Sequence, residues 1–485
     1  MMDATLVQTR NPKLPMKVIR IFNSVFVLAA ALTATTVFAT NGMNLEGYGP
    51  QSTAMGGASM AFDNGTAAVI NNPATLSLME EKGRLDFAIG MLGPDITVTN
   101  NNIGESTESQ SNAFFMPAFG YAQRHNDMVF GFGVFGQGGM GCSYDADSWR
   151  GLGYGLENMT EVSVGRAIVP FAIKVTDKLH LAATVDFVWG GMDLKMAMSG
   201  AQFFDLVDPS QQQFGQASGA LVQSLGQMLQ QMPPGTTVDY AYFDFANSDD
   251  FTGEAKGTGW GGKIGAVYEA SSDWTFGLTY HMKTDLGNLN SSNAKVSFQM
   301  TMPEGMGTVN QTLAGEIDVV NFQWPAMLAA GVAFRPNPKT LLVFDLKQIY
   351  WASVMDSFRM GFVADEIPEN GPLGGQDLYA ELYQDWSNQL VFALGAAYEI
   401  TDQWTIRAGY NYGSNPVPNK YLNCLFPAIV ENHLTVGFGW AWSEASSIDF
   451  SAVYGFTATE TSGYNITAEH SQLNFQFMYS YRFGK

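Results

Sequence analysis

The C-terminal stretch that decides the fold reads Leu473-Asn474-Phe475-Gln476-Phe477-Met478-Tyr479-Ser480-Tyr481-Arg482-Phe483. Every second residue is large and apolar, and most of the residues between them are polar. Because successive side chains of a β-strand point to opposite faces, this period of two predicts a strand with one apolar and one polar face. A soluble sandwich also alternates. However, an unbroken row of six large apolar side chains, mostly aromatic, is typical of a strand that faces lipid.

The same alternation recurs upstream, for example at 179–189, 404–413 and 434–443, where the second face is small or polar, as the lumen of a barrel is. The sequence therefore predicts an all-β fold, a transmembrane antiparallel barrel of about 14 strands, because bacterial barrels have an even number. The strands are expected near 84–96, 112–124, 128–136, 160–175, 178–198, 254–270, 273–300, 312–335, 339–360, 383–400, 402–414, 431–443, 446–459 and 468–483.

The connections between these strands alternate in length. Tight polar turns are expected at 124–127, 176–177, 271–272, 336–338, 401 and 444–445. The connections between the turns are long, the longest being 199–253, and outer-membrane barrels place such loops outside the cell. Within that loop, Leu221, Leu225, Met228 and Leu229 have helical spacing. This helix either covers the barrel mouth or packs within its own loop.

Composition supports a barrel and argues against other classes. Charged residues make up 14% of the 485 residues and aromatic residues 13%, with 52 glycines and a mean hydropathy of -0.02, which excludes a helical membrane protein. The net charge of -21 argues against nucleic-acid binding, because such a surface repels phosphates. The five scattered histidines and two cysteines form no metal-ligand spacing, and we expect no cofactor. Acidic pairs such as Asp249-Asp250 belong either to solvated loops or to cation bridges with lipopolysaccharide.

A targeting segment opens the chain. Residues 16–20 are basic, 21–32 are apolar but too short to span a bilayer, and Val37-Phe38-Ala39 is a small-residue cleavage site. We expect residues 1–39 to be a signal peptide that is removed, with Met1 or Met16 as the start; an uncleaved anchor is the alternative. Arg10, Lys13, Lys17 and Arg20 against Asp3 give this segment +3, so the mature chain carries -24. The destination predicted for the barrel is the outer membrane of a Gram-negative cell.

Residues 40–83 are not strand-like. Their small residues and short apolar runs predict compact turns and short helices, which would plug the lumen of the barrel formed by 84–485; a periplasmic tail is the alternative. Within this segment, Gly47-Tyr48-Gly49-Pro50-Gln51-Ser52-Thr53-Ala54-Met55-Gly56-Gly57-Ala58 and Asn72-Pro73-Ala74 resemble the start of the FadL/TodX-type transporters of long-chain fatty acids and aromatic hydrocarbons. The similarity of motifs covers about 40–80, and the rest of the chain matches in architecture.

The resemblance implies a mechanism. Members of this family capture hydrophobic ligands at the extracellular loops, hold them in an apolar pocket, shift the plug and release the ligand sideways at a kink in the third strand. It implies that Asn72, Pro73 and Ala74 lie near that kink, with Gly49, Gly56 and Gly57 in the plug motif. Pro73 restricts its own backbone and that of Asn72. Glycines inside the third strand favour a bulge or, alternatively, close packing against the plug; they are Gly131, Gly133, Gly136, Gly138 and Gly139.

Several other residues are candidates for the site. Ligand contact is expected from the plug residues Met43, Leu45, Met55 and Phe62, which otherwise form the plug core. Arg407 is predicted to face inward, where it either binds a ligand carboxylate or forms a salt bridge. Both cysteines, Cys142 and Cys424, fall in long outer loops and can pair as a disulfide if those loops meet.

Four functions remain open at this stage. A transporter of hydrophobic compounds is favoured over a porin for polar solutes, because a porin needs no plug. An outer-membrane lipolytic enzyme lacks a convincing inward-facing Ser beside a His, so the chain is predicted not to be an enzyme. A structural barrel has no use for a plug. The expected partners are a hydrophobic ligand, outer-membrane lipid, lipopolysaccharide and the barrel-assembly machinery, whose signal the aromatic C-terminus resembles.

Overall fold

The computed structural model describes residues 41–247, 252–303 and 305–484. The predicted signal peptide, 1–39, and the acidic pair Asp249-Asp250 lie outside these residues. No helix in the described part of the chain is both long and apolar enough to cross a membrane.

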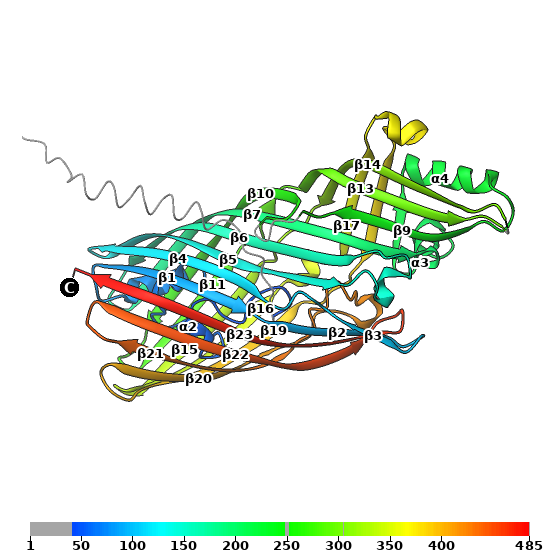
Figure 1. Cartoon of the computed structure of the whole chain (residues 1–485). Coiled ribbons are helices and arrows are strands. Elements are labelled where there is room, and N and C mark those ends of the chain that lie inside the picture. Colours follow the sequence, from blue (N-terminus) through cyan, green and yellow to red (C-terminus); the bar gives the residue numbers. More distant parts are fainter. Residues whose placement is uncertain (1–40, 248–251, 304, 485) are drawn as a thin grey trace, which may run out of the picture. The chain divides into compact units, whose positions relative to one another are not determined.

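Antiparallel pairing closes the main sheet into a ring, because β1 pairs with β4 on one side and with β23 on the other (Figure 1). Each strand of the ring pairs with the next, in the order β1 (Gly83–Leu92), β4 (Phe114–His125), β5 (Met128–Tyr144), β6 (Asn158–Lys174), β7 (Leu179–Ser199), β10 (Ala255–Glu269), β11 (Trp274–His281), β15 (Met327–Asn337), β16 (Thr340–Ile349), β19 (Gln389–Glu399), β20 (Trp404–Gly413), β21 (Asn432–Ala441), β22 (Ser446–Thr461) and β23 (Ile466–Phe483). The predicted closed barrel with an even number of strands is confirmed.

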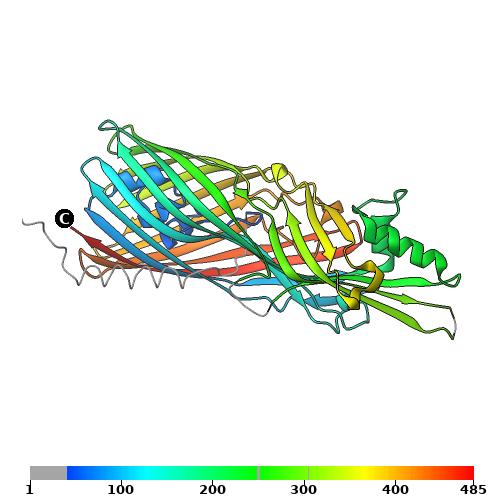
Figure 2. The ribbon, with the colours of Figure 1, turned by 90° about the horizontal axis from the view of Figure 1, so that it is seen from above.

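The two ends of the barrel differ as predicted. At one end, here called the turn end, short segments join β4 to β5, β6 to β7, β10 to β11, β15 to β16, β19 to β20 and β21 to β22. The C-terminus lies at the same end (Figure 1). The long connections gather at the opposite end, here called the loop end, together with α4 (Ala220–Gln231) (Figure 2).

Nine further strands, here called the outer sheet, extend the wall at the loop end as a continuation of the same sheet, because β2 pairs with β23 and β9 with β7. Its strands are β2 (Pro94–Asn100), β3 (Glu105–Glu108), β8 (Gly215–Ser218), β9 (Thr237–Phe245), β12 (Asp285–Leu286), β13 (Leu289–Thr301), β14 (Thr308–Val320), β17 (Ser357–Ala364) and β18 (Asp377–Tyr383). The predictions of single strands over 273–300, 312–335 and 339–360 are therefore wrong. In each range the chain leaves the ring and enters this sheet, where β13 pairs with β9 and β14, and β14 with β17. The alternation of side chains continues where the chain leaves the ring, because the strands outside the ring also have two unlike faces.

The helices are short. The long loop contains α3 (Gly200–Val207) and α4, whose residues Leu221 and Leu225 are buried where it packs against β18 and β8. The predicted helical spacing is thus confirmed, and the helix lies on the outer sheet beyond the ring (Figure 2). The other helical turns outside the plug are η3 (Trp149–Gly151), η4 (Trp351–Ser353), η5 (Pro368–Leu373) and η6 (Asn419–Tyr421).

The exposure of side chains is inverted relative to a soluble protein. On β23 the apolar residues Leu473, Phe477 and Tyr481 are 45, 42 and 43% exposed. Their polar neighbours Asn474 and Ser480 are each only 1% exposed. Large apolar side chains are exposed in the same way on most strands of the ring. A continuous apolar outer surface around a polar-lined interior is the arrangement of a barrel in a bilayer.

Residues 41–82 lie inside the ring and form the plug (Figures 1 and 2). Its elements are α2 (Pro50–Thr53), η1 (Gly65–Val69) and η2 (Pro73–Leu78). The first packs against β21 and β22, the second against β1, β4 and β5, and the third against β6, β7 and β10. Tight turns fold the plug: Gly57 has a φ of 82°, and a Cβ there would collide with the carbonyl oxygen of Glu46.

Candidate functional site

The wall of the barrel is incomplete between its second and third strands. β4 pairs with β5 only from Phe119 opposite Val134 to His125 opposite Met128. Residues 114–118 of β4 pair with β1 on their other side but have no partner on β5. Pro117 lies in this unpaired part, and a proline has no N–H to donate to a neighbouring strand. Between Val134 and the loop end of the barrel, β4 and β5 are therefore not paired. This lateral gap in the wall is here called the β4–β5 gap.

A bulge in β5 lies next to this gap. The register with β6 shifts between Gly136 and Gly138, so that Gln137 is an extra residue on β5. A bulge bends the strand that carries it, and this one lies just beyond Val134, where pairing with β4 ends. Glycine is required at 138, because a Cβ there would collide with the carbonyl oxygen of Met43 and with the ring of Trp324.

The first residues of the plug cover the bulge. Asn44 forms a β-bridge with Gly138, and the Gly139 N–H donates to Met43 O over 3.1 Å. The Gln137 amide donates to Asn44 Oδ1 (3.2 Å) and to Tyr48 Oη (3.1 Å). The Tyr48 hydroxyl donates in turn to the Gln137 carbonyl. Burial raises the pKa of Tyr48 far above its usual value, so its hydroxyl stays protonated and able to donate.

The cavity at the gap is almost filled. It is lined by the plug residues Leu45 and Tyr48 and by Met116, Pro117 and Phe135 of the wall. Its volume is about 40 Å³, whereas a cavity that accepts benzene measures roughly 150 Å³. The gap is therefore too small for an aromatic molecule in this conformation.

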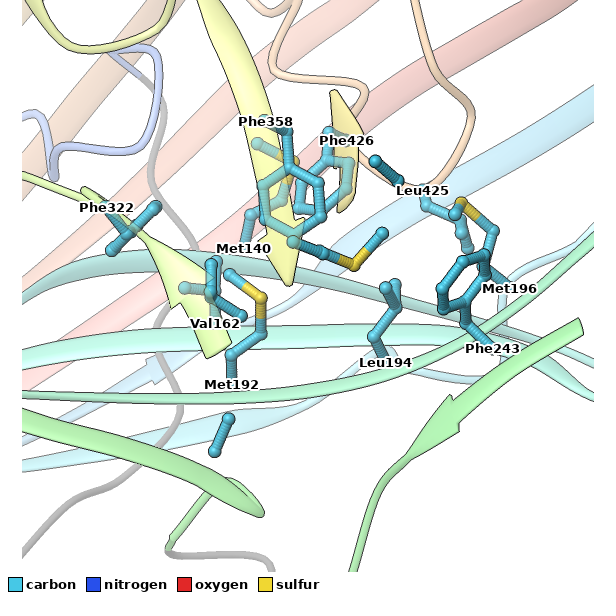
Figure 3. Packing of buried hydrophobic residues seen from close by; sticks show 14 of the residues in the cluster. Met140, Val162, Met192, Leu194, Met196, Phe243, Phe322, Phe358, Leu425 and Phe426 are labelled. Carbon is cyan, nitrogen blue, oxygen red and sulfur yellow. The ribbon is translucent and has the colours of Figure 1, made fainter. Parts of the chain in front are cut away.

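Apolar side chains fill the lumen between the plug and the loop end (Figure 3). They come from β5, β6, β7, β9 and β17, from the segment between β14 and β15 and from the segment after Cys424, and their side chains point toward one another; those labelled are Met140, Val162, Met192, Leu194, Met196, Phe243, Phe322, Phe358, Leu425 and Phe426. Methionine adapts to ligands of different shape. The plug residues Met43 and Leu45 belong to this same cluster, here called the lumen cluster.

A larger cavity opens at the loop end. Its volume is about 530 Å³, within the range of small-molecule sites. The lining combines apolar and aromatic side chains with nearly as many amide, hydroxyl and ionic ones, and includes Trp149, Arg150, Met196, Met198, Gln202, Asp205, Leu206, Gln213, Phe214, Lys420, Tyr421, Leu422, Asn423 and Tyr464. Met196, Met198, Leu206 and Leu422 also belong to the lumen cluster. Packed apolar side chains thus connect the edge of this cavity to the plug.

Comparison with known proteins identifies the family. The family model described as outer membrane protein transport protein (OMPP1/FadL/TodX) matches residues 26–482. The chain belongs to this OMPP1/FadL/TodX family. In agreement with the apolar outer surface of the ring, the protein is an outer-membrane β-barrel.

Solved structures and curated sequences of the family agree with this assignment. The Pseudomonas putida toluene transporter TodX is 28% identical, with a TM-score of 0.76 over 92% of this chain and 100% of that chain. The Ralstonia pickettii toluene transporter TbuX is 29% identical, with a TM-score of 0.72 over 91% and 99%. A long-chain fatty acid transport protein of Escherichia coli O6:H1 is 24% identical over 48% of this chain and 50% of its own length. A Chlorobium limicola protein is 49% identical over 18% and 43%. The chain thus spans about half the length, or less, of these curated relatives.

The Asn-Pro-Ala motif of the FadL/TodX resemblance anchors the plug to β10. The Asn72 amide donates to Met60 O (2.8 Å) and to Ala266 O (3.2 Å), and its Oδ1 accepts from Ala74 N to cap η2, in which Pro73 is the first residue. The motif was expected beside the bulge in β5, but its contact with that bulge is indirect: Asn71 Nδ2 donates to Tyr48 O (2.9 Å).

The other candidates from the sequence divide into two groups. Met43 and Leu45 face the lumen cluster, whereas Met55 and Phe62 pack with wall residues such as Val343 in a separate cluster. Gly49, Gly56 and Gly57 all have positive φ and form turns of the plug. Among the glycines of β5, only Gly136 and Gly138 flank the bulge; Gly131 and Gly133 lie where β4 is still paired, and Gly139 follows it.

For Arg407 and the two cysteines, the structure shows which of the stated alternatives it contains. Arg407 does not offer a free charge to a carboxylate, because it forms an ion pair of 2.7 Å with Asp449, which also accepts from Gln51. Cys142 and Cys424 are both buried and both free, so the structure contains no disulfide between them. The surrounding segments do meet, since Tyr144 Oη donates to Cys424 O over 2.8 Å.

A buried ion cluster lies in the wall beside the plug. Asp186 accepts from Arg166 (2.9 Å) and from Lys263, and all three side chains are at most 2% exposed. Nearby, His281 bonds to Asn71 O over 2.7 Å and so connects this part of the wall to the plug. Two cations share one carboxylate, so the cluster carries one uncompensated positive charge.

Sequence reasoning missed the residues that hold the plug at the bulge: Asn44, Tyr48, Gln137 and Trp324. Each contact joins residues far apart in the chain, and no local pattern marks them. Pro117 could have been found, because a proline inside a predicted strand marks a position without a hydrogen-bonded neighbour. No group of three or more His, Cys, Asp or Glu in the described ranges is arranged to hold a metal ion.

Proposed function

We propose that the protein moves small hydrophobic molecules across the outer membrane and releases them sideways through the β4–β5 gap. The observation that carries this proposal is the missing pairing of β4 residues 114–118 with β5, directly beside the plug residues Leu45 and Tyr48. Where two neighbouring strands of a barrel wall do not pair, their backbone N–H and C=O groups lack partners. A segment of the plug must cover these groups while the gap is closed.

The route begins at the loop end. A ligand enters the cavity of about 530 Å³ and continues into the lumen cluster through Met196 and Met198, which belong to both. It then meets Met43 and Leu45 of the plug. Withdrawal of the segment 41–48 from the bulge opens the gap to the lipid, into which an apolar molecule partitions. The activity is transport without catalysis.

Two substrate classes fit this route. TodX and TbuX are named as toluene transporters, and the Escherichia coli relative is named for long-chain fatty acids. The apolar lining suits both classes. A fatty acid also needs a cation, and the uncompensated charge of the cluster formed by Arg166, Asp186 and Lys263 would supply it in place of Arg407. The alternative of a porin for polar solutes is disfavoured, because the plug and the apolar side chains of the lumen cluster occupy the lumen.

The purified protein in lipid vesicles tests this proposal. We expect saturable binding of toluene or oleate, and no swelling of the vesicles in a small sugar such as arabinose. Met196→Asp puts a charge where the cavity joins the lumen cluster, so binding should weaken at least about tenfold. Met306→Asp is the matched control, because Met306 is 57% exposed on the outer hairpin. Swelling in arabinose without ligand binding would establish the porin instead.

A further inference from the structure

The plug is held in two different ways. Its middle is fixed to the wall by buried ionic groups: Asp345 Oδ2 accepts from Ser59 N (2.7 Å) and Met60 N (3.2 Å), and Lys347 Nζ donates to Gly57 O (2.7 Å). Toward the turn end, Arg84 forms a bidentate pair with Asp63, both distances being 2.8 Å. The segment 41–48 contacts the bulge through neutral groups instead, and its one charged side chain, Glu46, accepts from Asn474 Nδ2 of β23 over 3.4 Å. Neutral hydrogen bonds are weaker than those to charged groups, so the bulge contacts are the ones that can break first.

The side chain of Asn44 joins this segment to two sides of the lumen. Its Oδ1 accepts from Gln137 Nε2 on the bulge (3.2 Å) and from Trp324 Nε1 (2.9 Å), which precedes β15 across the lumen. Asn44 is 8% exposed and Trp324 is 1% exposed. One oxygen therefore receives both donors, and movement of the indole removes one of them.

Trp324 begins a row of three buried tryptophans. Its ring meets Trp351 edge-on, with centroids 5.6 Å apart, and Trp351 meets Trp386 in the same way at 5.4 Å. All three belong to the lumen cluster, as does Met43. The cluster is closely filled, so a ligand that enters it must displace side chains, and the row of indoles borders the space it takes.

We propose that the Asn44–Trp324 hydrogen bond is a latch that couples a ligand in the lumen to the β4–β5 gap. A ligand that tilts Trp324 removes a donor from Asn44, weakens the bridge to Gly138 and frees Met43 O from Gly139 N–H. Leu45 and Tyr48, which line the gap, then move with the segment. This inference rests on the proposed function, because it explains how binding and release are connected. Asn44 acts here as a positioning residue.

Hydrogen exchange in the whole protein tests the latch. Trp324→Phe keeps an aromatic ring but removes the N–H donor, and Trp386→Phe is its matched control, because Trp386 Nε1 has no hydrogen-bond partner in the described residues. Without ligand, we expect Trp324→Phe to speed exchange in 41–48 and at the Gly139 amide by about five- to tenfold, the effect of losing one buried hydrogen bond. Trp386→Phe should speed exchange of these amides much less than Trp324→Phe does, because it removes ring contacts but no hydrogen bond, and Asn44→Leu should speed it more than Trp324→Phe does.

Toluene is the probe for coupling. In the wild type, toluene should raise the hydrogen-exchange rate of the amides in 41–48 and of Gly139. In Trp324→Phe, toluene should raise these rates little further. Slow exchange in Trp324→Phe, or equal acceleration in Trp386→Phe, overturns the latch. Binding of toluene with no change in wild-type exchange overturns the coupling. If toluene and oleate both fail to bind, the proposed function fails, while the ligand-free comparison of the two variants still decides whether the Asn44–Trp324 bond holds the segment.

Discussion

Replacing Asp186 with asparagine destabilises the barrel by about 3–5 kcal/mol, the cost of leaving buried charges without their partner. Asp186 is the one carboxylate that pairs with both Arg166 and Lys263, and none of the three side chains is more than 2% exposed. An asparagine of the same size keeps hydrogen-bonding groups but not the negative charge. The two cations then repel each other in a site from which water is excluded.

Denaturant unfolding of the protein in lipid vesicles, followed by tryptophan fluorescence, measures this loss. Glu157→Gln is the control, because Glu157 pairs with Lys195 but is 60% exposed. Exposed pairs contribute about 0–1 kcal/mol, so the midpoint of this variant should barely change. Equal midpoints for Asp186→Asn and the wild type would show that the cluster does not hold the wall together.

Replacing Asp345 with alanine should release the middle of the plug while the barrel stays closed. The carboxylate accepts two backbone N–H groups, from Ser59 and Met60, and its loss leaves the buried Lys347 with Glu46 as its remaining negative neighbour. Hydrogen bonds to a charged group contribute about 1.5–3 kcal/mol each. Exchange of the Ser59 and Met60 amides should therefore accelerate by about tenfold to a hundredfold, measured by mass spectrometry.

Asp318→Ala is the matched control for the plug variant. Asp318 lies on β14 in the outer sheet and accepts only from Asn290 among the described bonds, so exchange in the plug should not change. Heat-dependent migration in gels checks that both barrels remain folded. If Ser59 and Met60 stay protected in Asp345→Ala, Asp345 is not the anchor of the plug.

The strands of the ring could be predicted from the sequence because the bilayer requires the same alternation of side chains in each of them. On β23, the lipid-facing residues are Leu473, Phe477 and Tyr481, and Asn474 faces inward. A period of two is therefore enough to find β23 and the other strands of the ring. The same alternation could not distinguish the strands of the outer sheet from those of the ring. β13 and β14 alternate as ring strands do, and only the long-range pairing of β13 with β9 shows that they have left the ring.

The site was predictable only in part. The glycines of β5 indicated a bulge, because glycine permits both the bend and the close approach of Met43 to Gly138. The resemblance placed Asn72, Pro73 and Ala74 near the kink. In the structure Asn44 and Tyr48 make the contacts with the bulge, and Asn72 bonds to β10. Hydrogen bonds between residues about 90 positions apart, such as Tyr48 and Gln137, leave no periodic trace in a single sequence.

Release through the side of the barrel is the central claim, and deletion of Gln137 tests it most directly. The deletion removes the extra residue of the bulge, so β5 can pair with β6 in continuous register and straighten toward β4. Deletion of Asp239, the extra residue of a bulge in β9 of the outer sheet, is the matched control. The measurement is transfer of bound toluene, or of oleate if that is the ligand, from the protein into the surrounding bilayer. Without Gln137 the ligand should still bind but transfer should fall to the level of protein-free vesicles, and without Asp239 transfer should continue; undiminished transfer without Gln137 would contradict lateral release.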